Sequence, residues 1–211
     1  MENSTGIEVK EVCKSFGTEQ VLKNISFFIP PGSIYGVVGN NGSGKTVLMK
    51  CICGFMKCDK GMILVNGRQV GKEVDFPDRL GVIIETPGFI PNLSGYKNLK
   101  VLASLKGRIG KVEIRETIKK VGLNPDMKKP VAKYSLGMRQ RLGIAQAIME
   151  DPDVLVLDEP FNGLDRYGVV EIRTLLKELK AAGKSILLAS HNAQDIEELC
   201  DHVLDLMMER E

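Results

Sequence analysis

The sequence predicts an α/β fold built around a largely parallel central sheet. Short apolar runs are separated by glycine and proline, and longer helical patterns lie between several of these runs. Near the middle of the chain this alternation stops, and only helical patterns follow one another. The alternation predicts parallel strands joined by helices, and its interruption predicts an inserted helical subdomain.

Seven apolar runs are expected to be strands. Their residue ranges are 7–12, 25–29, 34–38, 62–65, 82–84, 154–157 and 186–189. Residues 65–67 read Val-Asn-Gly, which is typical of a tight hairpin turn. The turn predicts an antiparallel β subdomain at the edge of the fold, early in the chain.

Three helical patterns follow in the central part of the chain. Ser94 can cap the first, the second covers residues 112–121 and is closed by Gly122, and the third covers residues 136–149. A later helix shows an apolar stripe and can end at Gly183, directly before the strand at 186–189. We therefore expect one domain, 1–211. Its core and β subdomain would occupy 1–87 and 150–211, and its helical subdomain 88–149.

Composition and charge exclude several classes of protein. The chain has 211 residues, of which 43% are hydrophobic and 27% charged, as in ordinary globular proteins. Lys and Arg number 29 against 27 Asp and Glu, so no broad positive field favours nucleic acid. The amino terminus lacks the pattern of a secretory signal, which favours the cytoplasm. The five cysteines lack zinc-site spacing and are expected to be free thiols.

The segment GNNGSGKT, residues 39–46, matches the phosphate-loop pattern and lies between an expected strand and an expected helix. Its backbone N–H groups can turn onto a phosphate. Lys45 supplies a mobile cation for the terminal phosphates, and Thr46 offers a hydroxyl to Mg²⁺. The predicted ligand is a nucleoside triphosphate. The residues expected to hold it are Gly39, Asn40, Asn41, Gly42, Ser43, Gly44, Lys45, Thr46 and Val47.

The run VLVLDEP, residues 154–160, is an apolar strand that ends in two carboxylates. Buried charge is costly unless a cation or a reacting water meets it. We expect Asp158 to bind Mg²⁺ and Glu159 to orient or deprotonate the attacking water. Alone, such a pair is more often a helix cap or a solvated loop, and the phosphate loop makes the functional interpretation the stronger one.

Between these motifs lies KYSLGMRQRLGIAQAI, which begins a strongly helical segment. Ser135 is a good N-cap, and a helix N-terminus can bind an anion. Judged on capping alone, this is also what an ordinary capped helix looks like.

In their order, the phosphate loop, YSLGMRQR, VLVLDEP, NGLD (162–165) and the Ser-His pair at 190–191 resemble the ATP-binding subunit of an ABC transporter over nearly the whole chain. The resemblance implies two ATP molecules sandwiched between two such subunits. It implies that Ser135 and Gly137 meet the γ-phosphate bound by the opposite subunit, that Asp165 crosses the dimer seam, and that His191 contacts the γ-phosphate. Phe16 matches the aromatic that stacks on adenine, although aromatics are mostly core residues.

The sequence also departs from the family pattern. Glu85 stands where the family usually has a glutamine that contacts Mg²⁺ and water, which adds a negative charge near the phosphates while keeping an oxygen ligand. Val47 replaces a common hydroxyl residue, leaving only its backbone N–H for the α-phosphate. The signature YSLGM keeps Ser135 and Gly137 and loses the other glycine and the glutamine.

The resemblance implies an ATPase that binds ATP and Mg²⁺, pairs with a second ATP-binding subunit and drives a separate membrane permease from the inner face of the membrane. The motif details resemble the branch that exports bacitracin and lantibiotic peptides. The segment 88–134 is the expected permease contact, unless it packs on its own domain. The alternatives are a soluble chromosome or translation ATPase and an ATP-sensing regulator. Glu159 argues against the regulator, and one short cassette argues against the others.

Overall fold

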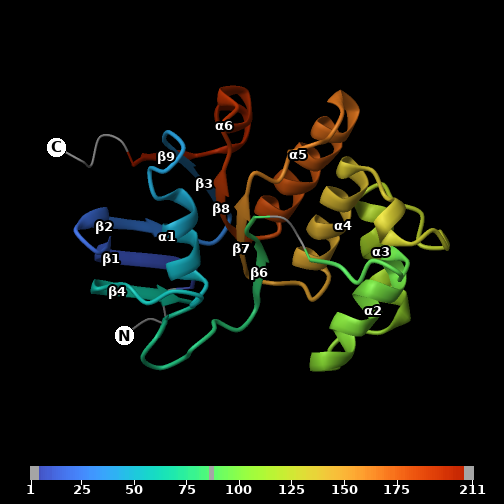
Figure 1. The fold of residues 1–211 in the computed structure, drawn as a ribbon, viewed down its shortest axis with the longest axis horizontal. Coiled ribbons are helices and arrows are strands. Elements are labelled where there is room, and N and C mark those ends of the chain that lie inside the picture. The colour runs from blue at the N-terminus through green and yellow to red at the C-terminus, as the bar shows by residue number, and fades with distance from the viewer. Residues whose placement is uncertain (1–4, 86–87, 207–211) are drawn as a thin grey trace.

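The computed structural model describes residues 5–85 and 88–206, and its elements form two sheets and a group of helices (Figure 1). A five-stranded sheet has the order β6-β7-β8-β3-β9, and every neighbouring pair in it is parallel. Its strands are β3 (Ser33–Val38), β6 (Leu80–Ile83), β7 (Val154–Asp158), β8 (Ser185–Ala189) and β9 (His202–Asp205).

A second sheet is antiparallel and has the order β2-β1-β4-β5. It contains β1 (Ile7–Phe16), β2 (Glu19–Ile29), β4 (Lys60–Val65) and β5 (Arg68–Gln69). The predicted hairpin turn joins β4 to β5, where Val65 pairs with Arg68. The expected antiparallel β subdomain is confirmed, and it forms a sheet of its own.

Helix α1 (Lys45–Ile52) lies between the two sheets. Its buried side chains Leu48, Met49, Cys51 and Ile52 pack in one apolar cluster with residues of both sheets. Burial raises the pKa of the Cys51 thiol to about 12, and it does the same for Cys53 at the end of the helix. Both thiols therefore stay neutral and add no charge beside the loop that α1 follows.

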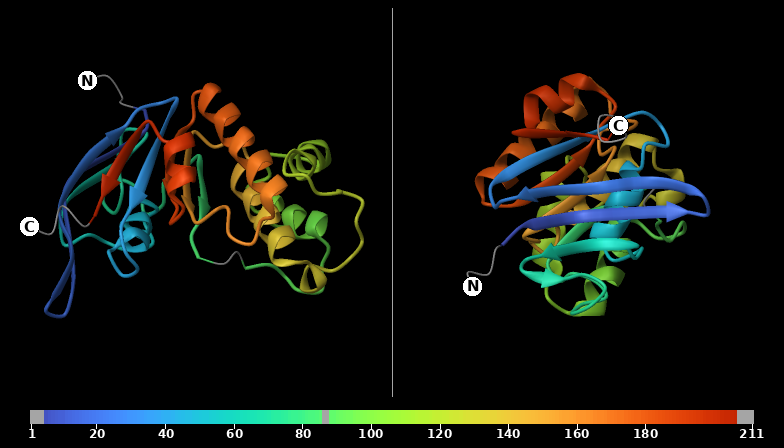
Figure 2. Two further views of the ribbon diagram at one scale, coloured as in Figure 1. Left: turned by 90° about the horizontal axis from the view of Figure 1, so that it is seen from above. Right: turned by 90° about the vertical axis from the view of Figure 1, so that its left-hand side faces the viewer.

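The helices α2 (Gly95–Lys106), α3 (Lys111–Lys120) and α4 (Leu136–Ile148) are inserted between β6 and β7, as the sequence predicts. A short 3-10 turn (Val131–Lys133) precedes α4. Ser94 caps α2 by accepting a hydrogen bond from the N–H of Lys97. Figures 1 and 2 show the three helices on the far side of the parallel sheet from β1 and β2.

Helix α5 (Arg166–Ala181) leads into β8, and α6 (Ala193–Leu199) leads into β9. The apolar stripe of α5 is buried at Ile172, Leu175 and Leu176, in one cluster with residues of α2, α3 and α4. This cluster attaches the inserted helices to the sheet. The described part of the chain contains no helix with both the length and the hydropathy of a membrane span.

All seven expected strands are present. Two further strands, β5 and β9, were not predicted because they are only two and four residues long, too short for an alternating pattern to be visible. The observed helix limits lie within one residue of those predicted for the second and third inserted helices. Residues at both chain ends that entered the sequence interpretation, 1–4 and 207–211, lie outside the described residues.

Candidate functional site

The loop between β3 and α1 has a backbone that most residues could not adopt. Gly39 and Gly44 have φ angles of 147° and 103°, in the region that favours glycine. A Cβ on Gly39 would lie 2.5 Å from the hydroxyl oxygen of Ser43, and one on Gly44 would lie 2.9 Å from a methyl carbon of Val21. The glycines are thus required for a tight loop that leads into the N-terminus of α1.

Two side chains of this loop suit an anionic ligand. The ammonium group of Lys45 donates hydrogen bonds to the carbonyl oxygens of Gly39, at 2.6 Å, and Asn40, at 3.0 Å, across the loop. The hydroxyl of Ser43 is buried and has no hydrogen-bond partner among the described residues. A buried polar atom without a partner is costly, so this hydroxyl fits a loop that receives an oxygen-rich ligand such as phosphate.

Strand register brings the predicted carboxylates to the same edge as the loop. Asp158 ends β7, and its Oδ2 accepts a hydrogen bond of 2.9 Å from the hydroxyl of Thr46, the second residue of α1. Glu159 follows, and its Oε2 lies 2.7 Å from Nδ1 of His191, which follows β8. A hydroxyl beside a carboxylate is a suitable pair of hard oxygen ligands for Mg²⁺, which keeps several waters and binds few protein groups.

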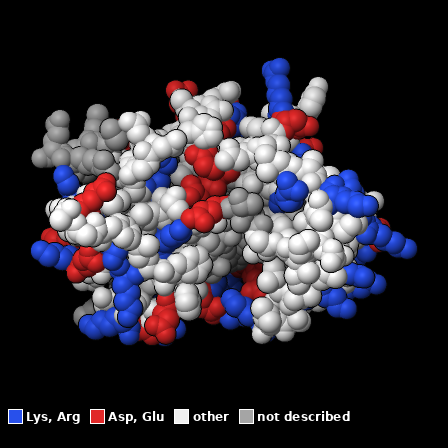
Figure 3. All heavy atoms as spheres, viewed as in Figure 1, with Lys and Arg blue, Asp and Glu red and all other residues white. Residues whose placement is uncertain are grey.

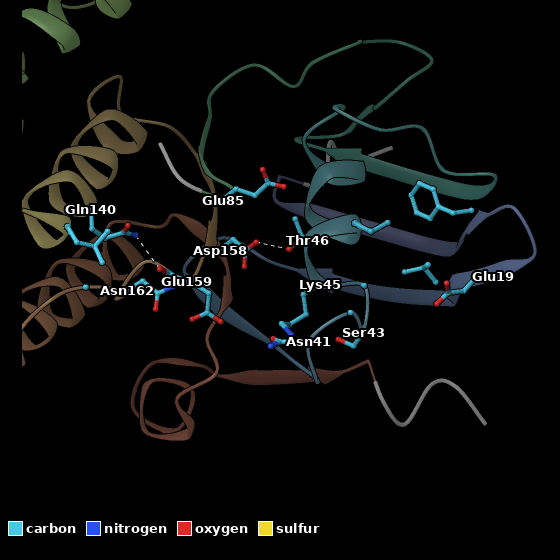
Figure 4. A pocket seen from close by; sticks show the side chains of 17 residues that line it. Glu19, Asn41, Ser43, Lys45, Thr46, Glu85, Gln140, Asp158, Glu159 and Asn162 are labelled. Carbon is cyan, nitrogen blue, oxygen red and sulfur yellow. Dashed lines mark hydrogen bonds between the residues drawn. The ribbon is translucent and has the colours of Figure 1, made fainter. Parts of the chain in front are cut away.

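Glu85 and Glu159 share an unusual backbone. They follow the neighbouring strands β6 and β7, and their φ angles are 60° and 50°. For a residue with a side chain the left-handed region costs on the order of 1 kcal/mol or more, and such strain concentrates at functional sites. Both residues line the same cavity (Figure 4). The Oε1 of Glu85 lies 2.6 Å from the ammonium nitrogen of Lys50.

These groups border a cavity of about 780 Å³, large enough for a nucleotide (Figure 4). The structure brings eleven predicted site residues to its lining, and those residues are Phe16, Asn41, Gly42, Ser43, Gly44, Lys45, Thr46, Val47, Glu85, Asp158 and Glu159. Phe16 is 47% exposed at its rim, so it is not a core residue. The ammonium group of Lys14 lies 5.6 Å from the centre of its ring.

Other predicted residues do not border this cavity. The carbonyl oxygens of Gly39 and Asn40 accept hydrogen bonds from Lys45, which lines the cavity. His191 contacts Glu159, which also lines it. Ser135 and Asp165 are exposed N-caps, accepting hydrogen bonds from the N–H groups of Met138 (3.1 Å) and Gly168 (2.7 Å). A Cβ on Gly137 would meet the carbonyl oxygen of Gly163 at 2.7 Å, so this glycine allows the start of α4 to contact the NGLD loop.

Sequence reasoning missed six lining residues, which are Glu19, Val21, Leu136, Gln140, Asn162 and Gly163. Glu19 and Val21 lie on β2, and no local motif marks them. Gln140 stands inside the quoted signature, and its side-chain amide donates a hydrogen bond of 3.2 Å to the backbone carbonyl of Glu159. The available signal for Gln140 was its place as a polar residue in the helix that begins after the predicted N-cap Ser135.

A glycine-rich loop between a parallel strand and a helix, with carboxylates at the ends of β6 and β7 in the same sheet, defines a P-loop nucleotide-binding protein. The profile of the ABC transporter family matches residues 22–162, and the chain belongs to this family as an ATP-binding subunit with ATPase activity.

Several relatives are similar over nearly the whole chain. An uncharacterized ABC transporter ATP-binding protein of Bacillus subtilis, YybJ, is 41% identical over 95% of this chain and 92% of its own length. The bacitracin transport ATP-binding protein BcrA of Enterococcus faecalis is 41% identical over 96% of this chain, which spans only 66% of BcrA. The lantibiotic transport ATP-binding protein SrtF of Streptococcus pyogenes is 38% identical over 93% of this chain and 85% of its own length.

Solved structures show the same fold. An ATP-binding subunit of an ABC transporter superposes with a TM-score of 0.85 and 29% identity, covering 95% of this chain and 85% of that one. An ATP-binding cassette solved as a dimer with ADP and phosphate has a TM-score of 0.84 and 23% identity, covering 94% and 93% of the two chains. At this lower identity the likeness concerns the fold alone.

Proposed function

We propose that this subunit hydrolyses ATP in a dimer whose closing and opening drive a separate membrane permease, and that the solute is an exported peptide antibiotic or a similar molecule. The observation that carries the proposal is the division of the site. The groups for binding and hydrolysis line one cavity. Ser135 of the signature and Asp165 of NGLD are not in its lining and cap exposed helices, while their neighbours Leu136 and Gly163 border it. A second subunit is what would bring such residues to a nucleotide.

In this proposal the loop amides of residues 39–47 and the ammonium group of Lys45 bind the phosphates of ATP. The exposed ring of Phe16 stacks on the adenine. Thr46, Asp158 and Glu85 supply oxygen atoms to Mg²⁺, which when bound would neutralise phosphate charge. The observed contact of Thr46 with Asp158 suits this assignment.

Hydrolysis requires a water molecule aligned with the γ-phosphate. Glu159 accepts a hydrogen bond from this water and takes its proton as the water attacks, so that ADP and phosphate are released. An ionised carboxylate only accepts hydrogen bonds, so Nδ1–H of His191 donates to Glu159 and holds its carboxylate. His191 is 72% exposed and can also face the γ-phosphate.

Dimer formation is supported by what surrounds the exposed caps. Leu136, next to Ser135, is 53% exposed, and Tyr167, two residues after Asp165, is 81% exposed. Apolar side chains exposed beside polar caps are typical of a surface that meets another protein. We propose a head-to-tail pair in which Ser135 and Gly137 of one subunit contact the γ-phosphate held by the other, with Asp165 at the seam. The partner is a second copy or a related subunit.

The permease and the solute are proposed from the relatives, since BcrA and SrtF are named for bacitracin and lantibiotic transport. Binding a permease would place the subunit at the cytoplasmic face of the membrane. The proposed contact is the segment 88–134, within a helical subdomain of 88–149 that is attached to a core of 1–87 and 150–211. Within it Ile90 is 48% and Leu105 77% exposed, while Phe89 packs on the apolar cluster. Residues 86–87, which directly precede the helical subdomain, lie outside the described residues.

Replacing Glu159 with glutamine tests the proposal. The variant is expected to bind Mg²⁺ and ATP, to lose nearly all phosphate release, and to remain a dimer on light-scattering size analysis. Glu116→Gln, on the exposed face of α3, is the charge-matched control and should release phosphate at the wild-type rate. Wild-type turnover in Glu159→Gln, or a monomer at saturating ATP, would overturn the proposal.

A further inference from the structure

Lys50 is a residue of α1 that no motif marks and that contacts the candidate site. It lies four positions after Thr46, so the two side chains share one face of the helix. Thr46 reaches Asp158, and Lys50 reaches Glu85 with an Nζ to Oε1 distance of 2.6 Å. One helix face therefore holds a carboxylate from each of two neighbouring strand ends.

The charge around the cavity explains why this second contact matters. Four carboxylates line the cavity, those of Glu19, Glu85, Asp158 and Glu159, while Lys45 is the one Lys or Arg among the described lining residues. Figure 3 shows acidic side chains gathered in the middle of this face. A nucleoside triphosphate adds more negative charge, so an uncompensated carboxylate at position 85 would oppose its binding.

The backbone of the two partners fixes the geometry of the pair. Glu85 is held with φ at 60°, and the carbonyl oxygen of Lys50 accepts hydrogen bonds from the N–H groups of Phe55 and Met56. The Glu85 side chain is 64% exposed and that of Lys50 31% exposed, so surface stability alone gains little from this contact. Its position at the edge of the cavity is what distinguishes it.

We propose that Lys50 is a positioning residue that holds the Glu85 carboxylate and neutralises its charge at the edge of the cavity, so that a site with glutamate at this place still accepts ATP. The inference rests on the proposed function, because it concerns the affinity of the same cavity for nucleotide. It assigns Lys50 no direct contact with the nucleotide.

A double-mutant cycle tests the inference. The probes are fluorescent ATP and ADP, and their dissociation constants are measured with EDTA and with Mg²⁺ for wild type, Lys50→Met, Glu85→Gln and the double variant. Lys50→Met is expected to weaken ATP binding by about tenfold, and ADP binding by less, because the repulsion grows with phosphate charge. Glu85→Gln removes both the charge and a proposed Mg²⁺ ligand, so the cycle is read in EDTA, where Glu85→Gln should bind ATP more tightly than Lys50→Met and the double variant should resemble Glu85→Gln.

Two readouts separate this role from a merely structural one. The loss in Lys50→Met should shrink at high salt, since exposed charges are screened, whereas a folding defect would persist. Lys100→Met, on the exposed face of α2, removes the same net charge and should bind ATP as wild type does. Wild-type ATP affinity in Lys50→Met, or a double variant as weak as Lys50→Met, overturns the inference. Failure of the wild-type protein to bind ATP overturns the proposed function instead.

Discussion

At the scale of single residues, Asp153 shows how one carboxylate makes stability depend on pH without touching the nucleotide site. It precedes β7, at the edge of the sheet opposite the cavity, and accepts a hydrogen bond of 2.8 Å from a terminal guanidinium nitrogen of Arg79. Hydrogen bonds from Arg79 hold the pKa of Asp153 below its ordinary value of 3.8. In the unfolded chain that ordinary value returns.

The direction in which stability changes with pH follows from the difference between the folded and unfolded pKa values of Asp153. Because the pKa is lower in the folded state, this carboxylate stabilises the fold at pH above about 4, and its contribution is lost as the pH falls through the folded value. Asp153→Asn should lower the urea midpoint at pH 7 and flatten its decline between pH 5 and pH 3. Arg79→Met should do the same, while ATP hydrolysis at pH 7 stays unchanged. If the urea midpoint of either variant falls as steeply between pH 5 and pH 3 as that of wild type, the contact between Asp153 and Arg79 is not the source of this pH dependence.

The site residues that could be predicted from the sequence are those whose function depends on one short segment of the chain. The loop 39–46 carries its function in consecutive residues, so glycine spacing and flanking patterns were sufficient to predict it. The pairing of Lys50 with Glu85, 35 positions away, depends on how α1 packs beside the end of β6, and a single sequence does not contain that packing. The alternative that Phe16 is a core residue was excluded only by the exposure of its side chain in the fold.

At the scale of elements, a buried polar network joins α5, α6 and the end of β8. Nε of Arg173 donates to Asp195 at 3.0 Å, and the other carboxylate oxygen of Asp195 accepts from the hydroxyl of Ser190 at 2.8 Å. Arg173 and Asp195 are 7% and 1% exposed. Ser190 directly precedes His191, so the network fixes the backbone that presents this histidine.

Removing one partner of the network should be costly. Asp195→Ala leaves the Arg173 charge buried with only Glu198, at 2.7 Å, to meet it, and the free energy of unfolding should fall by about 3 kcal/mol. Glu198→Gln changes the half-exposed end of the network and should lower the free energy of unfolding far less than Asp195→Ala does. Urea unfolding followed by circular dichroism measures both. If the free energy of unfolding of Asp195→Ala lies within about 0.5 kcal/mol of the wild-type value, the network does not stabilise the fold.

Helices with strong end signals were predicted nearly to the residue, as Ser94 before α2 and Gly122 after α3 show. The network of Arg173 was not predicted, because an arginine in an amphipathic helix is normally a solvated residue. Only the packing of α6 over α5 buries it. Local signals therefore define elements, and long-range packing decides which of their polar residues are structural.

At the scale of the whole molecule, the parts of the site lie in two places. The cavity proposed to bind phosphate lies at the carboxyl edge of the parallel sheet. Ser135 and Asp165, the exposed N-caps of α4 and α5 (Figure 1), are outside its lining, and the neighbouring Leu136 and Gly163 border it. The order of motifs predicted both sets of residues. The sequence also predicted the insertion of α2, α3 and α4, but which residues line the cavity is known only from the fold. If two chains pair head to tail, each cavity receives Ser135 from its partner.

Mixing two defective variants tests this arrangement. Lys45→Ala removes the phosphate cation. Ser135→Asp keeps a good N-cap for α4 and places a negative charge toward the partner's γ-phosphate, so each variant alone should be inactive. In a mixed pair, one cavity carries both defects and the other carries neither. Equal mixing should restore about a quarter of the wild-type phosphate release, since half the pairs are mixed and each has one intact site.

The control is the mixture of wild-type chains with the double variant Lys45→Ala, Ser135→Asp. Its mixed pairs carry one defect in each of the two cavities, so they should add nothing to the rate given by the wild-type pairs. A chain that completed its own cavity would give the opposite pattern, because every mixed pair with a wild-type chain would then keep one intact site and the first mixture would stay inactive. Comparing the two mixtures at equal total protein therefore decides which subunit supplies Ser135 to each nucleotide.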